Sequence, residues 1–131
     1  MKLCPCDSQK RYLDCCGAYI QEKIPAETPE ALMRSRYTAY VEENYDYIKQ
    51  TMREPALSQF NKKEITKGKI QWLGLNVIAS SIDNHDPTIG FVEFKARYQL
   101  VGEGIERCIH ENSEFHRIKG CWYYVDGAHY G

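Results

Sequence analysis

The fold class is decided by the segment IGFVEFKARYQL, residues 89–100. Its apolar residues, Val92, Phe94, Ala96, Tyr98 and Leu100, alternate with the polar residues Glu93, Lys95, Arg97 and Gln99. Alternation with a period of two places the apolar side chains on one face of a strand and the charged ones on the other. We therefore predict a β-strand that has one face on a core and the other in solvent.

Three further strands are predicted around this one. Residues 70–82 are rich in branched side chains and end at the turn cluster DNHDP, residues 83–87. After a turn at 102–104, a long strand is expected over 105–118, and the tight turn Lys119-Gly120 leads to a last strand over 121–127. Short connections of this kind favour consecutive antiparallel strands.

A long helix is predicted before the strands. Thr28 is a suitable N-cap, Pro29 suits the first turn, and Met33, Tyr37, Tyr40, Val41 and Ile48 follow helical spacing. Residues 44–46 interrupt the helix or restart it before Pro55, and 55–69, with its small basic run, is expected to be a loop or weak helix. Helices followed by antiparallel strands indicate an α+β domain in which one sheet face covers the helix.

The first seventeen residues contain four of the six cysteines, in the pattern C-x-C-x8-C-C. Cys4, Cys6, Cys15 and Cys16 match the ligand number and type of a structural zinc site, so one zinc ion is expected. The alternatives are two disulfides or four ordinary thiols. Clustered cysteines in a reducing compartment favour metal over disulfides.

Composition excludes several classes of protein. A chain of 131 residues with 43% hydrophobic and 27% charged residues suits a single globular domain. The net charge of -1 gives no general attraction to nucleic acid, which makes nucleic-acid binding an unfavoured function. No signal-peptide pattern and no apolar run long enough for a membrane span is apparent, so a cytoplasmic location is expected.

The cysteine segment resembles the SEC-C motif, the zinc-binding tail of the preprotein translocase SecA. The resemblance rests on the cysteine spacing, on Ser8 and on the run Lys10-Arg11-Tyr12, while Asp7 and Gln9 stand where the family usually has glycine. In the translocase the motif recognises partners, including the chaperone SecB and the ribosome. The resemblance therefore implies a protein partner, related to the ribosome or to translocation and chaperones, bound through Lys10, Arg11 and Tyr12.

The remainder resembles the YchJ family of uncharacterised bacterial proteins. The matching segments, in order, are LMRSRY (32–37), WLGL (72–75), GFVEF (90–94), HENSEF (110–115) and WYYVDG (122–127). The resemblance implies a domain similar to nuclear transport factor 2, a cystatin-like cone in which a curved antiparallel sheet wraps around helices and can enclose a pocket. The expected organisation is a zinc knuckle at 1–17, a connector at 18–28 and the cone at 29–131.

Polar residues inside the strands are the candidates for a pocket. On the strand over 105–118, Glu111 and Ser113 share a face, and Arg36 on the helix either extends outward or reaches a buried acceptor such as that pair. The candidate pocket residues are Arg36, Trp72, His110, Glu111, Ser113, Tyr124 and Asp126. An internal structural network, a small-molecule pocket and a general base at His110 all remain open.

Two functions are carried forward. The favoured one is an interaction module, a zinc knuckle joined to a cone that acts as a scaffold or binds a ligand. Four thiolates leave zinc no open position for substrate, which argues against a hydrolytic metal centre and against an enzyme there. The alternative is a small-molecule binder or a pocket enzyme of the ketosteroid-isomerase type. Cys108 and Cys121 are expected to face each other across two strands as buried packing thiols.

Overall fold

The fold is a four-stranded antiparallel sheet with helices packed against one face. The computed structural model describes residues 2–60 and 69–130. The strands are β1 (Ile70–Ile82), β2 (Ile89–Leu100), β3 (Arg107–Ile118) and β4 (Cys121–His129), hydrogen-bonded in the order β1-β2-β3-β4. The predicted α+β class is confirmed. The predicted bounds of β1 and β2 are also confirmed, whereas β3 begins later than expected and β4 extends further, to His129.

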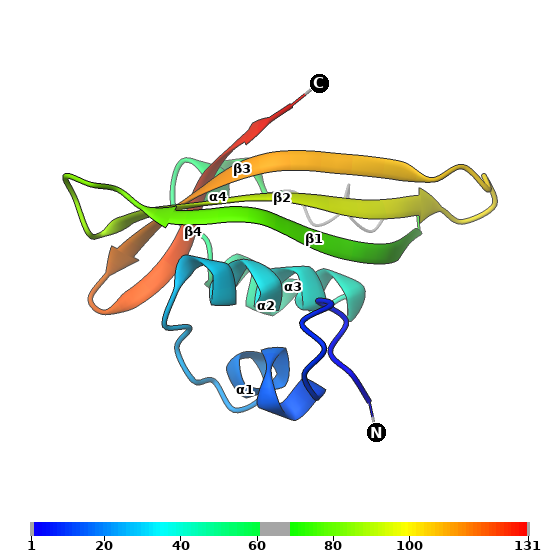
Figure 1. Cartoon of the computed structure of the whole chain (residues 1–131), viewed down its shortest axis with the longest axis horizontal. Coiled ribbons are helices and arrows are strands. Elements are labelled where there is room, and N and C mark those ends of the chain that lie inside the picture. Colours follow the sequence, from blue (N-terminus) through cyan, green and yellow to red (C-terminus); the bar gives the residue numbers. More distant parts are fainter. Residues whose placement is uncertain (1, 61–68, 131) are drawn as a thin grey trace.

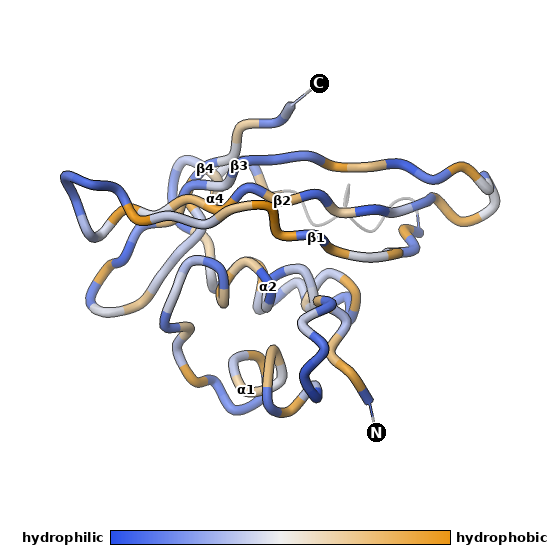
Figure 2. Tube along the Cα trace, in the orientation of Figure 1, coloured by the Kyte–Doolittle hydropathy of each residue, from blue (hydrophilic) through white to orange (hydrophobic). Residues whose placement is uncertain are grey.

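Three irregularities in the strand pairing curve the sheet and make one of its faces concave. They occur between Trp72 and Gly74, between Val77 and Ala79, and between Glu114 and Phe115. Each shift adds local twist to a strand, so the sheet curves toward the helices (Figure 1). Val92 and Ala96 of β2 are buried on this concave face, as the alternation predicted. Figure 2 shows the same alternation as changes of colour along the strands.

The helices begin where the sequence predicts. In α2 (Pro29–Val41), the Thr28 side chain accepts a hydrogen bond from Ala31 N at 3.0 Å. The helix restarts as α3 (Tyr45–Gln50), capped by Asn44. The segment from Pro55, predicted to be a loop or weak helix, contains the short helix α4 (Ala56–Gln59), and 61–68 lie outside the described residues. No helix in 2–60 or 69–130 is both long and apolar enough to cross a membrane.

Helix α2 lies between the sheet and the N-terminal segment (Figure 1). That segment contains a 3₁₀ turn (Tyr12–Asp14) and α1 (Cys16–Ile20), which packs against α2. One continuous cluster of buried residues extends from Cys4 to Trp122 and includes side chains from both sides of α2. The predicted apolar stripe is wrong at Val41, which is 37% exposed because it is the last residue of α2.

The free edge of β4 is covered by the segment that follows α3. Tyr124 N donates to Thr51 O at 2.8 Å, and Arg53 N donates to Tyr124 O at 3.0 Å. These bonds satisfy backbone groups that would otherwise be exposed at a sheet edge. They also hold the C-terminal end of α3 beside Tyr124, which positions the polar side chains of the site described below.

Candidate functional site

The four N-terminal cysteines form a cluster that can hold a metal ion. All four Sγ atoms lie within 4.8 Å of one another. The distance from Cys6 Sγ to Cys15 Sγ is 3.6 Å, and that from Cys15 Sγ to Cys16 Sγ is 4.0 Å. Tetrahedral coordination with Zn–S bonds of about 2.3 Å requires S···S separations of about 3.8 Å. The donor set and its spacing therefore fit a tetrahedral thiolate site.

Backbone contacts fold the loop that carries the cluster. Cys4 N donates to Lys10 O at 2.9 Å, and Leu3 forms a β-bridge with Arg11. Between them, Asp7 and Gln9 have left-handed φ values of 62° and 69°. Glycine adopts such conformations without steric cost, whereas here two L-residues occupy them.

Replacing Gln9 with glycine is expected to stabilise the protein. A left-handed conformation costs a non-glycine residue about 1 kcal/mol, and glycine removes this cost. Chemical denaturation should show the free energy of unfolding rising by about that amount. Asp7→Gly is the matched control, because its Oδ2 accepts a hydrogen bond from Leu75 N at 2.9 Å and its loss offsets the gain. Destabilisation by Gln9→Gly would contradict the assigned backbone strain.

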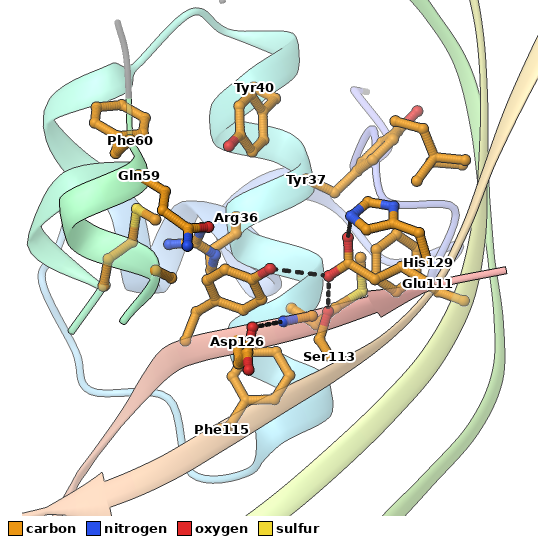
Figure 3. A pocket seen from close by; sticks show the side chains of 18 of the residues that line it. Arg36, Tyr37, Tyr40, Gln59, Phe60, Glu111, Ser113, Phe115, Asp126 and His129 are labelled. Atoms are coloured by element: carbon orange, nitrogen blue, oxygen red, sulfur yellow. Dashed lines mark hydrogen bonds and ion pairs between the residues drawn. The ribbon is translucent and has the colours of Figure 1, made fainter. Parts of the chain in front are cut away.

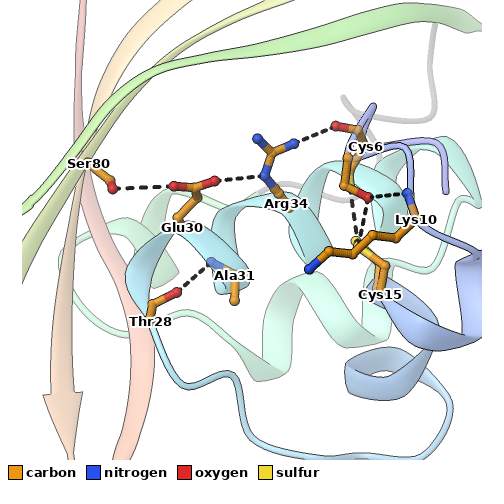
Figure 4. A network of polar contacts seen from close by, with 10 residues as sticks. Cys6, Lys10, Cys15, Thr28, Glu30, Ala31, Arg34 and Ser80 are labelled. Atoms are coloured by element: carbon orange, nitrogen blue, oxygen red, sulfur yellow. Dashed lines mark hydrogen bonds and ion pairs between the residues drawn. The ribbon is translucent and has the colours of Figure 1, made fainter.

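Polar contacts join the cysteine loop to the rest of the domain (Figure 4). Arg34 Nη1 of α2 donates to Cys6 O at 2.8 Å, and Arg34 Nε forms an ion pair with Glu30 at 3.0 Å. Ser8 Oγ lies 3.1 Å from Cys15 Sγ, and the Cys4 thiol lies 3.7 Å from Thr38 Oγ1. The cysteine cluster is therefore tied to α2 by hydrogen bonds.

Within the cluster the thiols differ in acidity. Hydrogen bonds from Cys16 and then from Cys4 lower the pKa of the Cys6 thiol. Hydrogen bonds with Cys4 and Cys6 raise the pKa of Cys16, and burial raises that of Cys15.

Of the three predicted partner-binding residues, Lys10 and Arg11 are exposed and Tyr12 is buried. The expectation that Tyr12 is presented to a partner is wrong, because its ring packs on Gly17. A Cβ at Gly17 would lie 2.8 Å from Tyr12 Cε2, so glycine alone leaves room for the ring. Gln21 Nε2 also donates to Tyr12 Oη at 3.2 Å. Tyr12 is a core residue of the knuckle.

A cavity of about 580 Å³ lies between α2, α4 and the concave face of the sheet. Its wall is largely apolar and includes the aromatic residues Tyr37, Tyr40, Phe60, Trp72, Phe94, Phe115 and Tyr124. Trp72 contacts Tyr37 and Tyr40, with ring centroids 5.6 and 5.9 Å apart. The polar side chains of the wall are Arg36, Gln59, Glu111, Ser113, Tyr124, Asp126 and His129, and all of them except Tyr124 are labelled in Figure 3. This combination of an apolar wall and a few polar groups is typical of small-molecule sites.

Glu111 is the centre of the polar wall. It is 8% exposed and accepts hydrogen bonds at Oε2 from Ser113 Oγ and from Tyr124 Oη, the latter at 3.1 Å. Its Oε1 lies 3.2 Å from His129 Nε2. A Cβ at Gly127 would collide with both Glu111 and Tyr124, so this glycine makes room for the network. Burial, followed by the charge of Glu111, raises the pKa of Tyr124.

Arg36 is buried beside this network and does not pair with Glu111 directly. Its Nη1 donates to Ile48 O at 2.8 Å and to Thr51 Oγ1 at 2.7 Å. The guanidinium lies over the ring of Tyr124, 4.6 Å from the centroid. The sequence left open an outward-pointing Arg36 or a bond to a buried acceptor such as Glu111. The structure shows a buried Arg36 whose acceptors are Ile48 O and Thr51 Oγ1, while Tyr124 contacts both Arg36 and Glu111. Burial lowers the pKa of Arg36.

Six of the seven predicted pocket residues line the cavity, and His110 does not. Neighbouring residues of a strand point to opposite faces, so the inward Glu111 directs His110 outward. His110 Nε2 lies 2.7 Å from Glu93 Oε2 on that outer face. The prediction of His110 as a pocket base is therefore wrong. Asp126 lies at the exposed rim.

The sequence did not single out Tyr40 or His129 as pocket residues. Tyr40 was placed on the buried stripe of the helix, a signal that also fits an ordinary core residue. His129 lies beyond the predicted end of the last strand, so no pattern pointed to it.

Cys108 and Cys121 do not face each other. Cys108 is opposite Arg97 on β2, whereas Cys121 pairs with Ile118 next to the β3–β4 turn. Cys108 is exposed and Cys121 half-buried. The prediction of two opposed, buried thiols is wrong, because a hairpin pairs the end of one strand with the start of the next.

Comparisons with known proteins agree with this architecture. Residues 28–127 match the family "YchJ, middle NTF2-like domain". A UPF0225 protein of Yersinia pestis (strain Pestoides F) is 44% identical over 128 residues, which cover 96% of this chain and 82% of that protein. A UPF0225 protein of Yersinia pseudotuberculosis serotype O:3 (strain YPIII) has the same identity and coverage.

Two solved structures are also similar. The solution structure of a SEC-C motif containing protein from Rhodopseudomonas palustris has a TM-score of 0.85 and 37% identity, and covers 98% of each chain. The crystal structure of a SEC-C motif containing protein from Psychrobacter arcticus has a TM-score of 0.78 and 30% identity, and covers 94% of this chain and 80% of that one. The chain belongs to the UPF0225 (YchJ) family, with an NTF2-like domain and a SEC-C cysteine cluster.

Proposed function

We propose that this protein binds a small molecule in the cone cavity and that the cysteine cluster holds one structural zinc ion. The observation that carries the proposal is the cavity of about 580 Å³, in which an aromatic wall meets a few fixed polar groups. Ser113 and Tyr124 are both engaged in holding Glu111, which favours a preformed binding surface over a catalytic group.

Zinc is the metal we assign to the cluster, because four thiolates at tetrahedral spacing suit it. Four protein ligands fill its coordination sphere, so the ion contributes folding energy and leaves no position for substrate. Any binding or chemistry of small molecules is thereby assigned to the cavity. A thiolate site also suits the reducing cytoplasm, which is the location we propose.

A fragment screen by fluorine-detected NMR tests the proposed cavity. Ala96 lines the cavity and is 2% exposed, so Ala96→Leu should fill part of it and abolish the binding of fragments seen with wild type. Ala79→Leu is the matched control, because Ala79 is exposed on β1 outside the cavity. Fragments that bind all three proteins equally, or no binding to any, would contradict the proposed function.

A second candidate function is recognition of a protein partner through the knuckle. It is favoured by the exposed side chains of Lys10 and Arg11 and by Leu13, which is 60% exposed. The resemblance to the SecA tail suggests the ribosome or a translocation chaperone as the partner. Sedimentation with ribosomes should then weaken in a Lys10→Glu, Arg11→Glu variant and persist in Lys95→Glu, which changes an exposed lysine on β2. Equal sedimentation of wild type and both variants would contradict a role of Lys10 and Arg11 in binding ribosomes.

A further inference from the structure

The cavity wall contains a buried cation, the guanidinium of Arg36. Arg36 is 7% exposed, and none of the ion pairs among the described residues includes it. Its two hydrogen bonds both come from Nη1 and go to neutral oxygens. A buried charge is costly unless it is paired and hydrogen-bonded, so this guanidinium is only partly satisfied by its own chain.

The rest of the guanidinium is reached from the cavity. Nε and Nη2 of Arg36 donate no hydrogen bond to the described residues. Among those residues, Trp122 Nε1 is the only fully buried side-chain polar atom without a partner, so the two free nitrogens of Arg36 are not sealed off. Tyr124 lies over one face of the group, so a ligand would reach the guanidinium at its edge.

We propose that Arg36 is the anchor for a monocarboxylate with a flat apolar body, an inference that rests on the proposed binding function. Two parallel N–H groups of a guanidinium match the two oxygens of a carboxylate, and such charge-assisted bonds are among the strong ones. Tyr40, Phe60 and Trp72 line the same cavity and supply apolar contact for a ring. The charged anchor and the apolar wall together indicate that the ligand is an aryl or cycloalkyl carboxylic acid.

The charge of the ligand is limited by the other acids of the wall. Glu111 and Asp126 line the same cavity, and Arg36 is its buried cation. A dianion such as a phosphonate would add a second negative charge near these carboxylates, which raises its electrostatic cost. A single carboxylate pairs with Arg36 and adds one negative charge fewer than a dianion does. The cavity should therefore prefer a monocarboxylate over a phosphonate of the same shape.

Phenylacetate, phenylacetamide and benzylphosphonate form a matched probe series for wild-type protein. The dissociation constant of each, measured by NMR titration, should be at least about tenfold lower for phenylacetate than for the other two. The Arg36 Nε–H resonance should shift with phenylacetate only. Equal affinity for the amide would overturn the anchor while leaving small-molecule binding intact, and so would tighter binding of the phosphonate.

Two arginine variants locate the anchor. Arg36→Lys keeps the positive charge but loses the pair of parallel N–H donors. It should raise the dissociation constant of phenylacetate about tenfold and leave that of phenylacetamide unchanged. Arg53→Lys is the matched control, since Arg53 stacks on Tyr123 outside the cavity. The probe series uses wild-type protein alone, so it tests the preference for a monocarboxylate even if Arg36→Lys fails to fold. Unchanged phenylacetate binding in folded Arg36→Lys would overturn the proposal, and the fragment screen tests the binding function independently.

Discussion

Replacing Cys16 with serine is expected to release the metal and to lower the stability of the whole domain. Cys16 is fully buried, and its cluster belongs to the same buried core as the cone. Structural zinc contributes on the order of 10 kcal/mol to the folding of small metal domains, which is comparable to the net stability of an ordinary domain. Loss of the ion should therefore leave much of the variant unfolded at 37 °C.

Metal analysis and circular dichroism check this result together. Wild type should carry about one zinc per chain, and Cys16→Ser should carry far less and melt at a much lower temperature. Cys108→Ser is the matched control, because this exposed thiol lies on β3 outside the cluster. Full retention of zinc by Cys16→Ser would contradict the metal assignment. Loss of metal with an unchanged melting curve would contradict the claim that the cluster and the cone share one core.

Glu111→Ala is expected to produce the other large loss. The substitution removes the acceptor of the Ser113 and Tyr124 hydroxyl groups and the ion-pair partner of His129. Leaving buried donors unsatisfied costs about 3 kcal/mol in total, in addition to the cavity that the lost side chain creates. Urea denaturation should show this decrease in the free energy of unfolding.

Two variants separate the network from a general effect of removing charge. Glu111→Gln keeps the size and an acceptor oxygen, so it should lose clearly less stability than the alanine variant. Glu114→Ala removes a carboxylate from the same strand, but that side chain is 36% exposed and pairs with His116 on the outer face, so the cost should be small. Similar losses for Glu111→Ala and Glu114→Ala would contradict the role of the network.

The sheet was predictable because its pattern is local. Alternation in β2 and the turn cluster after β1 depend on neighbouring residues, and both strands have the predicted ends. The cap at Thr28 and the restart at Asn44 are equally local, since each is one side chain that accepts a nearby backbone N–H. The number and spacing of the cysteines likewise predicted their convergence.

The errors concern contacts between distant segments. The burial of Tyr12 depends on the space above Gly17, which no periodicity reveals. The position of Arg36 depends on Tyr124 of β4, which contacts both it and Glu111. The error at His110 has a different cause. Both faces of β3 carry polar residues, so the sequence alone does not show which face points into the cavity.

The central claim is that the cysteine cluster, with its proposed zinc ion, and the cavity belong to one cooperative unit joined by α2. One denaturant titration tests it, with zinc release followed by a colorimetric chelator and the cone by tryptophan fluorescence. Both tryptophans, Trp72 on β1 and Trp122 on β4, lie in the sheet, so fluorescence reports the cone without the knuckle. The two curves are predicted to share one midpoint. Zinc release well before any change in fluorescence would show that the knuckle unfolds alone and contradict the claim.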